Sequence, residues 1–252
     1  MNIFYNILAP LSCLLFGYIF GSIPTAVIIG KVFYHQDPRN YGSHNSGGTN
    51  AGRLWGKKVG LLIIIIDMIK TIAPLWVCWA IFRYVTVDGL SLAPTVEDMN
   101  AAGFNSSHII PWPVYFMAPL GCILGHCWPI FAGFKGGKGV SCFMGTTVTT
   151  SWAFGFLPGF VYLAVLKSTK YVSLSGIVSS IVTMITSWIW AILQLYEVIP
   201  VKYCWIPMYG PNIAPGWIYA TLVTIMGLLM IVRHKENIAR IKAGTERKIT
   251  WM

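Results

Sequence analysis

The stretch from Val59 to Phe82 constrains this chain most, because it is almost entirely apolar and carries only two charged side chains, Asp67 and Lys70. A helix needs roughly 20 mostly apolar residues to cross the hydrocarbon core of a bilayer. The whole chain is 56% hydrophobic and 10% charged, whereas a soluble domain carries about 25% charged residues. The sequence therefore predicts an integral membrane protein.

The chain contains six apolar segments that could form spans, at residues 3–30, 59–82, 113–131, 140–166, 171–195 and 215–232. The fourth is too long for one span and contains Pro158 and several glycines, so it predicts two short helices folded back on each other. The first 30 residues contain no Lys or Arg, which is atypical of a cleaved signal peptide and favours a retained span. The predicted fold is all-α, with seven transmembrane helices in a single membrane-embedded domain, residues 1–252.

Basic residues gather in four of the segments that connect or follow these spans: 31–58, 132–139, 167–170 and 233–252. These segments hold 15 of the 18 lysines and arginines. The other connections, 83–112 and 196–214, hold only Arg83 and Lys202 beside four acidic residues. Because cytoplasmic loops are enriched in Lys and Arg, we expect the N-terminus outside and the C-terminus in the cytoplasm, which requires an odd number of crossings.

Four polar segments that contain glycine fall on this predicted cytoplasmic side: 21–25, 39–58, 134–139 and 233–248. Successive backbone N–H groups in glycine-rich turns form concave anion sites, and a helix that starts after such a turn adds its positive end. The segment FKGGKG at 134–139 is by itself also compatible with an interhelical turn whose lysines only set the topology. Together the four segments predict a surface that binds phosphate groups.

Several other kinds of site are not indicated. FKGGKG lacks the G-x-x-x-x-G-K-[ST] pattern of a nucleotide-binding P-loop, and neither a G-x-S-x-G elbow nor an HExxH zinc motif occurs. No His is followed five positions later by Asp, the arrangement of many acyl-CoA-dependent acyltransferases. The six cysteines and five histidines are scattered, unlike zinc ligands. A phosphate-handling membrane protein without an evident base suggests an activated substrate whose leaving group is a phosphate.

Four motifs carry a resemblance to a known family: GSIPTAVIIGK (21–31), RNYGSHNSGGTNAGRLWGKKVG (39–60), GHCWPIFAGFKGGKGV (125–140) and HKENIARIKAGTERK (234–248). In order and spacing they resemble the bacterial glycerol-3-phosphate acyltransferases that use acyl phosphate, the PlsY family. The resemblance implies a multi-pass protein of the bacterial plasma membrane, with seven helices and an active site facing the cytoplasm. It also implies an activity early in phospholipid biosynthesis, the transfer of a fatty acyl group from acyl phosphate to the sn-1 hydroxyl of glycerol 3-phosphate. The products are lysophosphatidic acid and phosphate.

Carried over position by position, the resemblance implies catalytic side chains that contact glycerol 3-phosphate: Ser43, Arg53, Lys138, His234 and Asn237. It implies that the donor phosphate is held by backbone N–H groups around Lys138, at Gly136, Gly137 and Gly139. The matching polar loop contributes Asn45, Thr49 and Asn50 to the substrate-binding set.

The resemblance implies neither a metal nor a cofactor, and no nucleic-acid partner. The expected partners are glycerol 3-phosphate, acyl phosphate, membrane lipids and the enzyme that makes acyl phosphate.

The chain departs from the family pattern at a few positions. His44 stands where the family has glycine, which matters if that position needs a positive φ, although His tolerates such geometry better than most residues. Gly48 replaces the alanine of a Gly-Ala-Thr-Asn motif, and Thr71 replaces the glycine that follows Lys70. The loop 83–112 is longer than is usual, and as a loop of the outer face we expect it to stay away from the chemistry.

Two readings stay open for the charged and polar residues inside the spans. Asp67 and Lys70 are spaced i,i+3 on one helix face, so they either brace the bundle as a mutual ion pair or serve function directly. His126 either packs and hydrogen-bonds or contacts substrate.

Two other functions also remain to be weighed. An organic-phosphate transporter would fit the phosphate-binding surface, but the motif segments are unlike one another and lie on one side, without the duplicated halves of many transporters. A CDP-alcohol phosphotransferase would need clustered aspartates, and only Asp37 lies near the motif loops.

Overall fold

The computed structural model describes residues 7–87, 90–91, 114–150, 152–196, 198 and 216–250. The described helices are α1 (Ala9–Gly21), α2 (Thr25–Phe33), η2 (Pro38–Asn40), α3 (Gly48–Trp55), α4 (Lys57–Tyr84), η4 (Val114–Phe116), α6 (Met117–Cys127), η5 (Ile130–Ala132), α7 (Val140–Thr150), α8 (Trp152–Thr169), α9 (Val172–Leu195), α10 (Gly216–Arg233) and α11 (Lys235–Lys242). One antiparallel hairpin joins β1 (Thr86–Val87) to β2 (Leu90–Ser91), pairing Thr86 with Ser91 and Val87 with Leu90.

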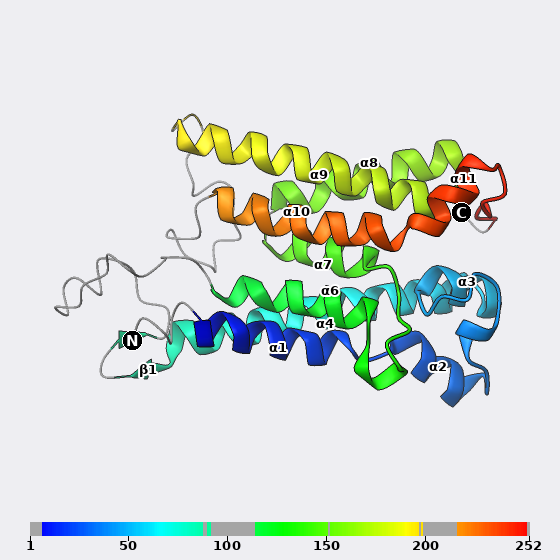
Figure 1. Cartoon of the computed structure of the whole chain (residues 1–252), viewed down its shortest axis with the longest axis horizontal. Helices are drawn as coiled ribbons and strands as arrows, with labels where there is room; N and C mark the ends of the chain where they lie inside the picture. Colours follow the sequence, from blue (N-terminus) through cyan, green and yellow to red (C-terminus); the bar gives the residue numbers. More distant parts are fainter. Residues whose placement is uncertain are drawn as a thin grey trace.

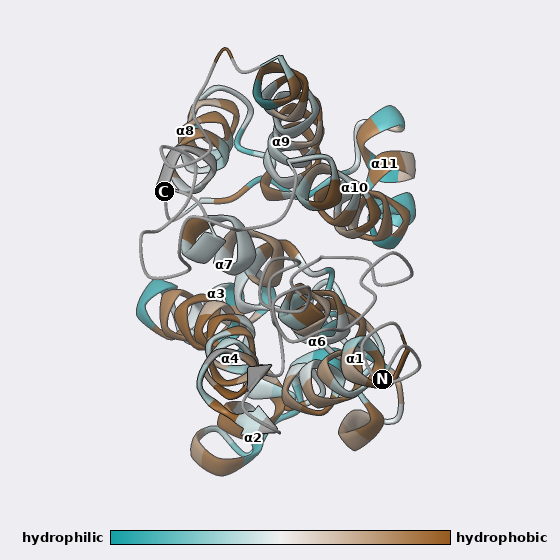
Figure 2. Cartoon of the chain, turned by 90° about the vertical axis from the view of Figure 1, so that its left-hand side faces the viewer, coloured by the Kyte–Doolittle hydropathy of each residue, from teal (hydrophilic) through white to brown (hydrophobic). Residues whose placement is uncertain are grey.

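The long helices run side by side as a bundle (Figure 1). Seen along the bundle, α1, α4 and α6 form one group, α8, α9 and α10 form another, and α7 lies between them (Figure 2). Contacts follow this arrangement, since α7 packs against both α4 and α8. Large apolar side chains such as Ile65, Phe160 and Ile189 are exposed on the outside. A bundle that exposes such residues matches a lipid environment better than water.

Glycines on two helices set the tightest helix contact. Gly17 and Gly21 of α1 face Gly121 and Gly125 of α6, and a Cβ on any of the four would collide with backbone atoms of the facing helix. Small residues spaced four apart let membrane helices approach closely, so that van der Waals packing holds them together without a hydrophobic effect. The close α1–α6 pair fixes where the C-terminal end of α6, and the loop that follows it, can lie.

The span predictions are supported in part. Five helical segments are long and apolar enough to cross a membrane: Ala9–Phe33, Lys57–Phe82, Val114–Ala132, Val172–Leu195 and Gly216–Arg233. The predicted division of 140–166 is confirmed, because α7 and α8 pack against each other and Gly155 of α8 lies against the backbone of Val148 of α7. Since α7 has only 11 residues, it is about 16 Å long and covers about half of the hydrocarbon core. The count of seven crossings and the orientation of the bundle stay predictions. So does most of what is expected of the loop 83–112, because residues 88–89 and 92–113 lie outside the described residues.

The buried charges on α4 form the predicted ion pair. Lys70 Nζ lies 2.8 Å from Asp67 Oδ1 and also donates to the carbonyl oxygen of Ile23 at 3.0 Å. Asp67 Oδ1 accepts a further hydrogen bond from the Thr25 hydroxyl at 2.8 Å. The neighbouring Thr71, where the family has glycine, donates its hydroxyl to the Asp67 carbonyl at 3.2 Å. The pair therefore fastens α4 to the break between α1 and α2.

The polar segments gather at one end of the bundle. There α2, α3 and α11 lie beside the loops that join α2 to α3 and α6 to α7 (Figure 1). This is the end at which the glycine-containing motifs meet.

Candidate active site

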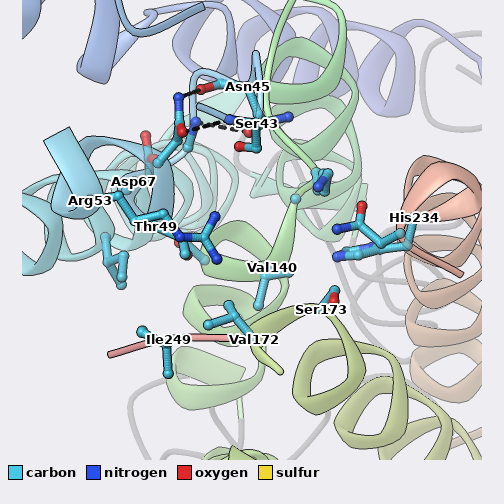
Figure 3. A pocket seen from close by; sticks show the side chains of 18 of the residues that line it. Ser43, Asn45, Thr49, Arg53, Asp67, Val140, Val172, Ser173, His234 and Ile249 are labelled. Carbon is cyan, nitrogen blue, oxygen red and sulfur yellow. Dashed lines mark hydrogen bonds between the residues drawn. The ribbon is translucent and has the colours of Figure 1, made fainter. Parts of the chain in front are cut away.

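A cavity of about 470 Å³ opens among these polar segments. It is lined by nine of the eleven residues expected to act on substrate: Ser43, Asn45, Thr49, Asn50, Arg53, Lys138, Gly139, His234 and Asn237. Two expected residues, Gly136 and Gly137, do not line it. Ser43, Thr49 and Arg53 lie on one side of the cavity and His234 lies on the opposite side (Figure 3). Three chain segments far apart in sequence therefore contribute polar groups to one space.

Asn50 organises the loop that precedes α3. Its Nδ2 donates to the carbonyl oxygens of Pro38, Tyr41 and Asn45 at 2.8, 3.1 and 3.0 Å, and its Oδ1 accepts the N–H of Ser43 at 3.0 Å. Asn50 is only 1% exposed. Because its Nδ2 hydrogens and one acceptor position of Oδ1 are used within this loop, Asn50 holds Ser43 in place, and its expected contact with substrate stays a prediction.

The departure at His44 falls on a left-handed backbone position. His44 has φ of 54° and Gly42, two residues earlier, has φ of 61°, a conformation that costs roughly 1–2 kcal/mol for a residue with a Cβ. His44 Nδ1 lies 3.1 Å from the carbonyl oxygen of Arg39, which offsets part of this cost. The chain thus keeps the loop shape that a glycine would adopt without strain.

The glycines before Lys138 let the loop pack closely against α6. The N–H of Gly137 donates to the carbonyl oxygen of His126 at 2.9 Å, so it is not available to an acyl-donor phosphate. A Cβ on Gly137 would collide with the His126 ring, and one on Gly136 would collide with the His126 carbonyl oxygen. The Gly137 N–H is therefore used to seat the loop on α6, whereas the expected contact of the Gly136 N–H with the acyl-donor phosphate stays a prediction. Gly139, with φ of 85°, does line the cavity.

Side chains from two other segments hold this loop as well. Asn45 Nδ2 donates to the Gly136 carbonyl at 3.4 Å, and the Arg233 guanidinium donates to the Gly137 carbonyl at 3.3 Å. Arg39, paired with Asp37 at 2.7 Å, donates to the Ala132 carbonyl at 2.7 Å. The loop that carries Lys138 is thus held by three side chains from these two segments.

Two cations face the cavity with few partners. Burial lowers the pKa of Lys138 to about 8, and among the described residues its ammonium makes no hydrogen bond or ion pair. Burial likewise lowers the pKa of Arg53, whose Nη2 donates to the Arg247 carbonyl at 3.2 Å. Partly desolvated cations that lack an anion are favourable binding groups for one, because a phosphate restores the charge balance that burial removed.

His234 presents a lone pair to the cavity. It is 2% exposed, and its Nδ1 lies 2.7 Å from the Met230 carbonyl. Burial lowers the pKa of His234 to about 4, so the ring is neutral at physiological pH. Since a carbonyl only accepts, the hydrogen is on Nδ1, and Nε2 is a hydrogen-bond acceptor. This geometry suits a substrate hydroxyl and does not suit an oxyanion.

Sequence reasoning assigned no role to Glu246, although it lines the cavity. Burial raises its pKa, but hydrogen bonds from Ser173, Asn237 and Arg240 outweigh burial and lower the pKa overall. The sequence feature that could have indicated Glu246 is the scarcity of acidic residues. Only Asp37, Glu236 and Glu246 lie in the segments predicted to be cytoplasmic. His126 has two roles here. Its carbonyl oxygen accepts the N–H of Gly137 in the loop that carries Lys138, and the residue also lines the cavity.

The cavity continues from this polar end along an apolar wall. Its apolar lining comes mainly from α4, α7 and α8 (Leu61, Ile64, Met68, Val140, Met144 and Leu163), with Val172 of α9 and Ile249 of the C-terminal segment. Gly159 of α8 also lines it, with open space where a Cβ would be. The arrangement can therefore hold a molecule with an anionic group, hydroxyl groups and a hydrocarbon chain.

Comparison with known proteins agrees with this chemistry. The family model described as glycerol-3-phosphate acyltransferase matches residues 11–244. A glycerol-3-phosphate acyltransferase of Ureaplasma parvum is 32% identical over 93% of this chain and 86% of its own length. One from Listeria monocytogenes is 30% identical, covering 94% and 96%.

Solved structures agree in fold. The crystal structure of PlsY (YgiH), an integral membrane glycerol 3-phosphate acyltransferase, in its glycerol 3-phosphate form, superposes with a TM-score of 0.68 at 28% identity, over 96% of both chains. The lysophosphatidic acid form of that protein gives a TM-score of 0.65 at 26% identity, again over 96% of both chains.

Proposed function

The chain belongs to the PlsY family of integral membrane glycerol-3-phosphate acyltransferases, and from this premise we propose its donor, product and site. It transfers a fatty acyl group from acyl phosphate to the sn-1 hydroxyl of glycerol 3-phosphate, giving lysophosphatidic acid and inorganic phosphate. One observation carries the proposal: a single cavity joins Arg53 and Lys138, whose ammonium makes no hydrogen bond or ion pair among the described residues, to an apolar wall.

The polar end suits two phosphate groups. Arg53 offers a forked guanidinium and Lys138 a compact ammonium, the two side chains that proteins use for phosphate. The first residues of α3 and α7 line the same cavity, and backbone N–H groups at helix starts favour anions. The hydroxyl group of Ser43 and the side-chain amides of Asn45 and Asn237 then orient the glycerol.

The reaction needs little covalent help from the protein. The glycerol hydroxyl oxygen attacks the acyl carbonyl carbon, the bond from that carbon to the phosphate oxygen breaks, and phosphate leaves with the electron pair. The hydroxyl proton ends on the released phosphate. Before attack His234 Nε2 accepts a hydrogen bond from this hydroxyl and so aligns it; as the new C–O bond forms, the proton passes to an oxygen of the departing phosphate, on which Lys138 and Arg53 stabilise the growing charge. Holding both reactants at attack distance supplies much of the acceleration.

The apolar wall suits the fatty chain. Leu61 and Ile64 of α4, Met144 of α7 and Leu163 of α8 give the cavity a hydrocarbon-like side. Burying a methylene there is favourable by about 0.8 kcal/mol. A chain laid along this wall would run from the polar end toward the lipid.

We place the site at the cytoplasmic face of a bacterial plasma membrane. The segments around it hold most of the chain's basic residues, as expected of cytoplasmic loops. Acyl phosphate, made by a separate enzyme, and glycerol 3-phosphate would both reach the cavity from that side.

The test is a phosphate-release assay. Purified protein in detergent or lipid, given palmitoyl phosphate and glycerol 3-phosphate, should release phosphate and lysophosphatidic acid without added coenzyme A. Dependence on acyl-CoA, or no product where an established acyltransferase gives product, contradicts the proposal. Uptake of labelled glycerol 3-phosphate into proteoliposomes in the absence of acyl phosphate would instead indicate a transporter.

A further inference from the structure

Glu246 is a buried carboxylate that accepts hydrogen bonds from three side chains on two helices, α9 and α11. Its Oε1 accepts from the Ser173 hydroxyl at 2.7 Å and from Asn237 Nδ2 at 2.6 Å, and its Oε2 accepts from Arg240 Nε at 2.8 Å. Its side chain is only 7% exposed. Glu246 lies just beyond the residues matched by the family model, which end at 244. It thus joins the C-terminal segment to α9 and α11 at the edge of the cavity.

The contact with Glu246 decides which way the Asn237 amide points. An ionised carboxylate has no hydrogen to donate, so only the NH2 end of the amide can face it. Hydrogen bonds from its three donors outweigh burial and hold the pKa of Glu246 below its usual range, which keeps this polarity fixed. The amide oxygen of Asn237 must therefore lie on the other side.

That oxygen is buried and has no partner. Among the described residues, Asn237 Oδ1 is the buried side-chain polar atom without a hydrogen bond, and Asn237, which is 5% exposed, lines the cavity. An unsatisfied buried acceptor costs about 1–3 kcal/mol and calls for an explanation. A ligand hydroxyl that draws the side chain slightly toward the cavity would supply the missing donor.

The neighbouring residue has the same polarity. His234 and Asn237 are spaced i,i+3 at the start of α11, so their side chains share a helix face. His234 Nε2 is also an acceptor, because its Nδ1 hydrogen is given to Met230. Two adjacent acceptors match the two hydroxyl groups of glycerol 3-phosphate and repel its phosphate.

We infer that Glu246 is a positioning residue for glycerol 3-phosphate: by accepting the Asn237 N–H, it turns the Asn237 oxygen toward a substrate hydroxyl. This inference rests on the proposed function and deepens it, since it assigns a basis for hydroxyl specificity. It separates the site into a hydroxyl-reading side at α11 and a phosphate-holding side at Arg53 and Lys138.

The experiment compares binding of substrate analogues without any acyl donor. Isothermal titration in detergent measures the Kd of glycerol 3-phosphate, of 3-hydroxypropyl phosphate, which lacks the secondary hydroxyl, and of 2-hydroxypropyl phosphate, which lacks the primary one. In the wild-type protein at least one analogue should bind about tenfold or more weakly than glycerol 3-phosphate, as expected for one lost hydrogen bond to a buried acceptor.

In Glu246→Gln the glutamine amide can donate as well as accept, so the Asn237 amide is free to reverse. The analogue penalty, meaning the ratio of the analogue's Kd to the Kd of glycerol 3-phosphate, should then shrink to roughly threefold or less. Ser173→Ala is the matched control, because it removes another hydrogen bond to the same Glu246 oxygen and leaves the Asn237 contact in place; its analogue penalty should stay at the wild-type value. A full penalty in Glu246→Gln overturns the inference.

Asn237→Ala decides the question if Glu246→Gln does not fold, because it removes the proposed acceptor directly. It should erase the penalty for one analogue, and retention of both penalties overturns the inference. Since no acyl donor is present, these outcomes leave the proposed reaction intact. Absence of lysophosphatidic acid from the wild-type protein in the separate assay would overturn the reaction instead.

Discussion

Nδ1 of His234 lies 2.7 Å from the carbonyl oxygen of Met230, four residues earlier at the end of α10. This contact fixes the hydrogen on Nδ1 and leaves Nε2 as an acceptor at the cavity. Burial lowers the pKa of His234 to about 4, so the arrangement persists at physiological pH. The carbonyl of Met230, at the end of α10, thereby fixes the tautomer of His234. We propose that His234 Nε2 accepts a hydrogen bond from the attacking hydroxyl.

His234→Asn tests this tautomer. Asparagine can keep the donor toward Met230 but has no atom in place of Nε2, so kcat/KM for glycerol 3-phosphate should fall by about ten- to a hundredfold, or roughly 1.5–3 kcal/mol. In the wild-type enzyme, activity should be lost as pH falls through about 4, because protonation of Nε2 removes the acceptor. A pH profile of the initial rate measures both effects. His35→Asn, at an exposed position outside the cavity, should behave as wild type, and an equal loss there would contradict the assignment.

Lys138 should set the alkaline limit of activity. Burial lowers its pKa to about 8, so the ammonium is charged below that pH and neutral above it, and kcat/KM should fall as pH rises through about 8. Lys138→Arg keeps the charge and should move this limit upward.

Lys138→Ala and Arg53→Ala should each reduce activity at neutral pH by about a hundredfold or more, roughly 3 kcal/mol of transition-state stabilisation. Lys135→Ala, at an exposed position in the same loop, is the control, and an unmoved alkaline limit in Lys138→Arg would refute the role.

Much of the site could be predicted because polar and glycine residues are conspicuous in so apolar a chain. The segments 39–58, 134–139 and 233–248 were recognisable by composition alone, and residues of all three line the cavity. The division of 140–166 was predictable for a similar reason, since glycine and proline interrupt helices.

The finer roles could not be predicted because they depend on contacts between distant residues. The Gly137 N–H is occupied by His126, and the sequence does not reveal that α6 ends against this loop. Asn50 was grouped with ligand-binding residues, yet its amide is used by its own loop. The role of Glu246 likewise appears only when the C-terminal segment is seen to fold back onto Ser173 and Asn237.

The left-handed backbone at His44 predicts an order of stabilities. With φ of 54°, the position should accept glycine without loss and should penalise a β-branched residue, which is a strained occupant of this region. The free energy of unfolding of His44→Val should be about 1–2 kcal/mol below that of His44→Gly, while His44→Gly should be neutral or slightly stabilising relative to the wild-type protein. Thermal denaturation in detergent would compare the three proteins. Equal midpoints for the valine and glycine variants would show that the position is not strained.

Gly159 should determine how well long acyl chains fit. A Cβ at this position meets open space, and Gly159 lines the cavity, so a large side chain there would fill volume that we propose the chain uses. Gly159→Phe should reduce turnover of palmitoyl phosphate by about tenfold or more while sparing decanoyl phosphate, because only the longer chain loses buried methylenes at about 0.8 kcal/mol each. Rates with both donors measure the effect. Phe160→Leu, an exposed neighbour that does not line the cavity, should leave the ratio unchanged, and equal inhibition of both donors by Gly159→Phe would place the chain elsewhere.

The orientation of the bundle can be tested with two single-cysteine reporters. Lys135 lies exposed in the loop that carries Lys138, and Tyr196, 73% exposed, follows the far end of α9. The described cysteines, at 13, 78, 122, 127 and 142, are all buried, so in a Cys204→Ser background they should react slowly. A membrane-impermeant maleimide should label Tyr196→Cys in intact spheroplasts and Lys135→Cys only in inverted vesicles, because the basic residues around Lys135 are expected to stay in the cytoplasm. Labelling of both reporters from the same side would require an even number of crossings between them, and it would remove the two-sided topology on which the cytoplasmic placement of the cavity depends.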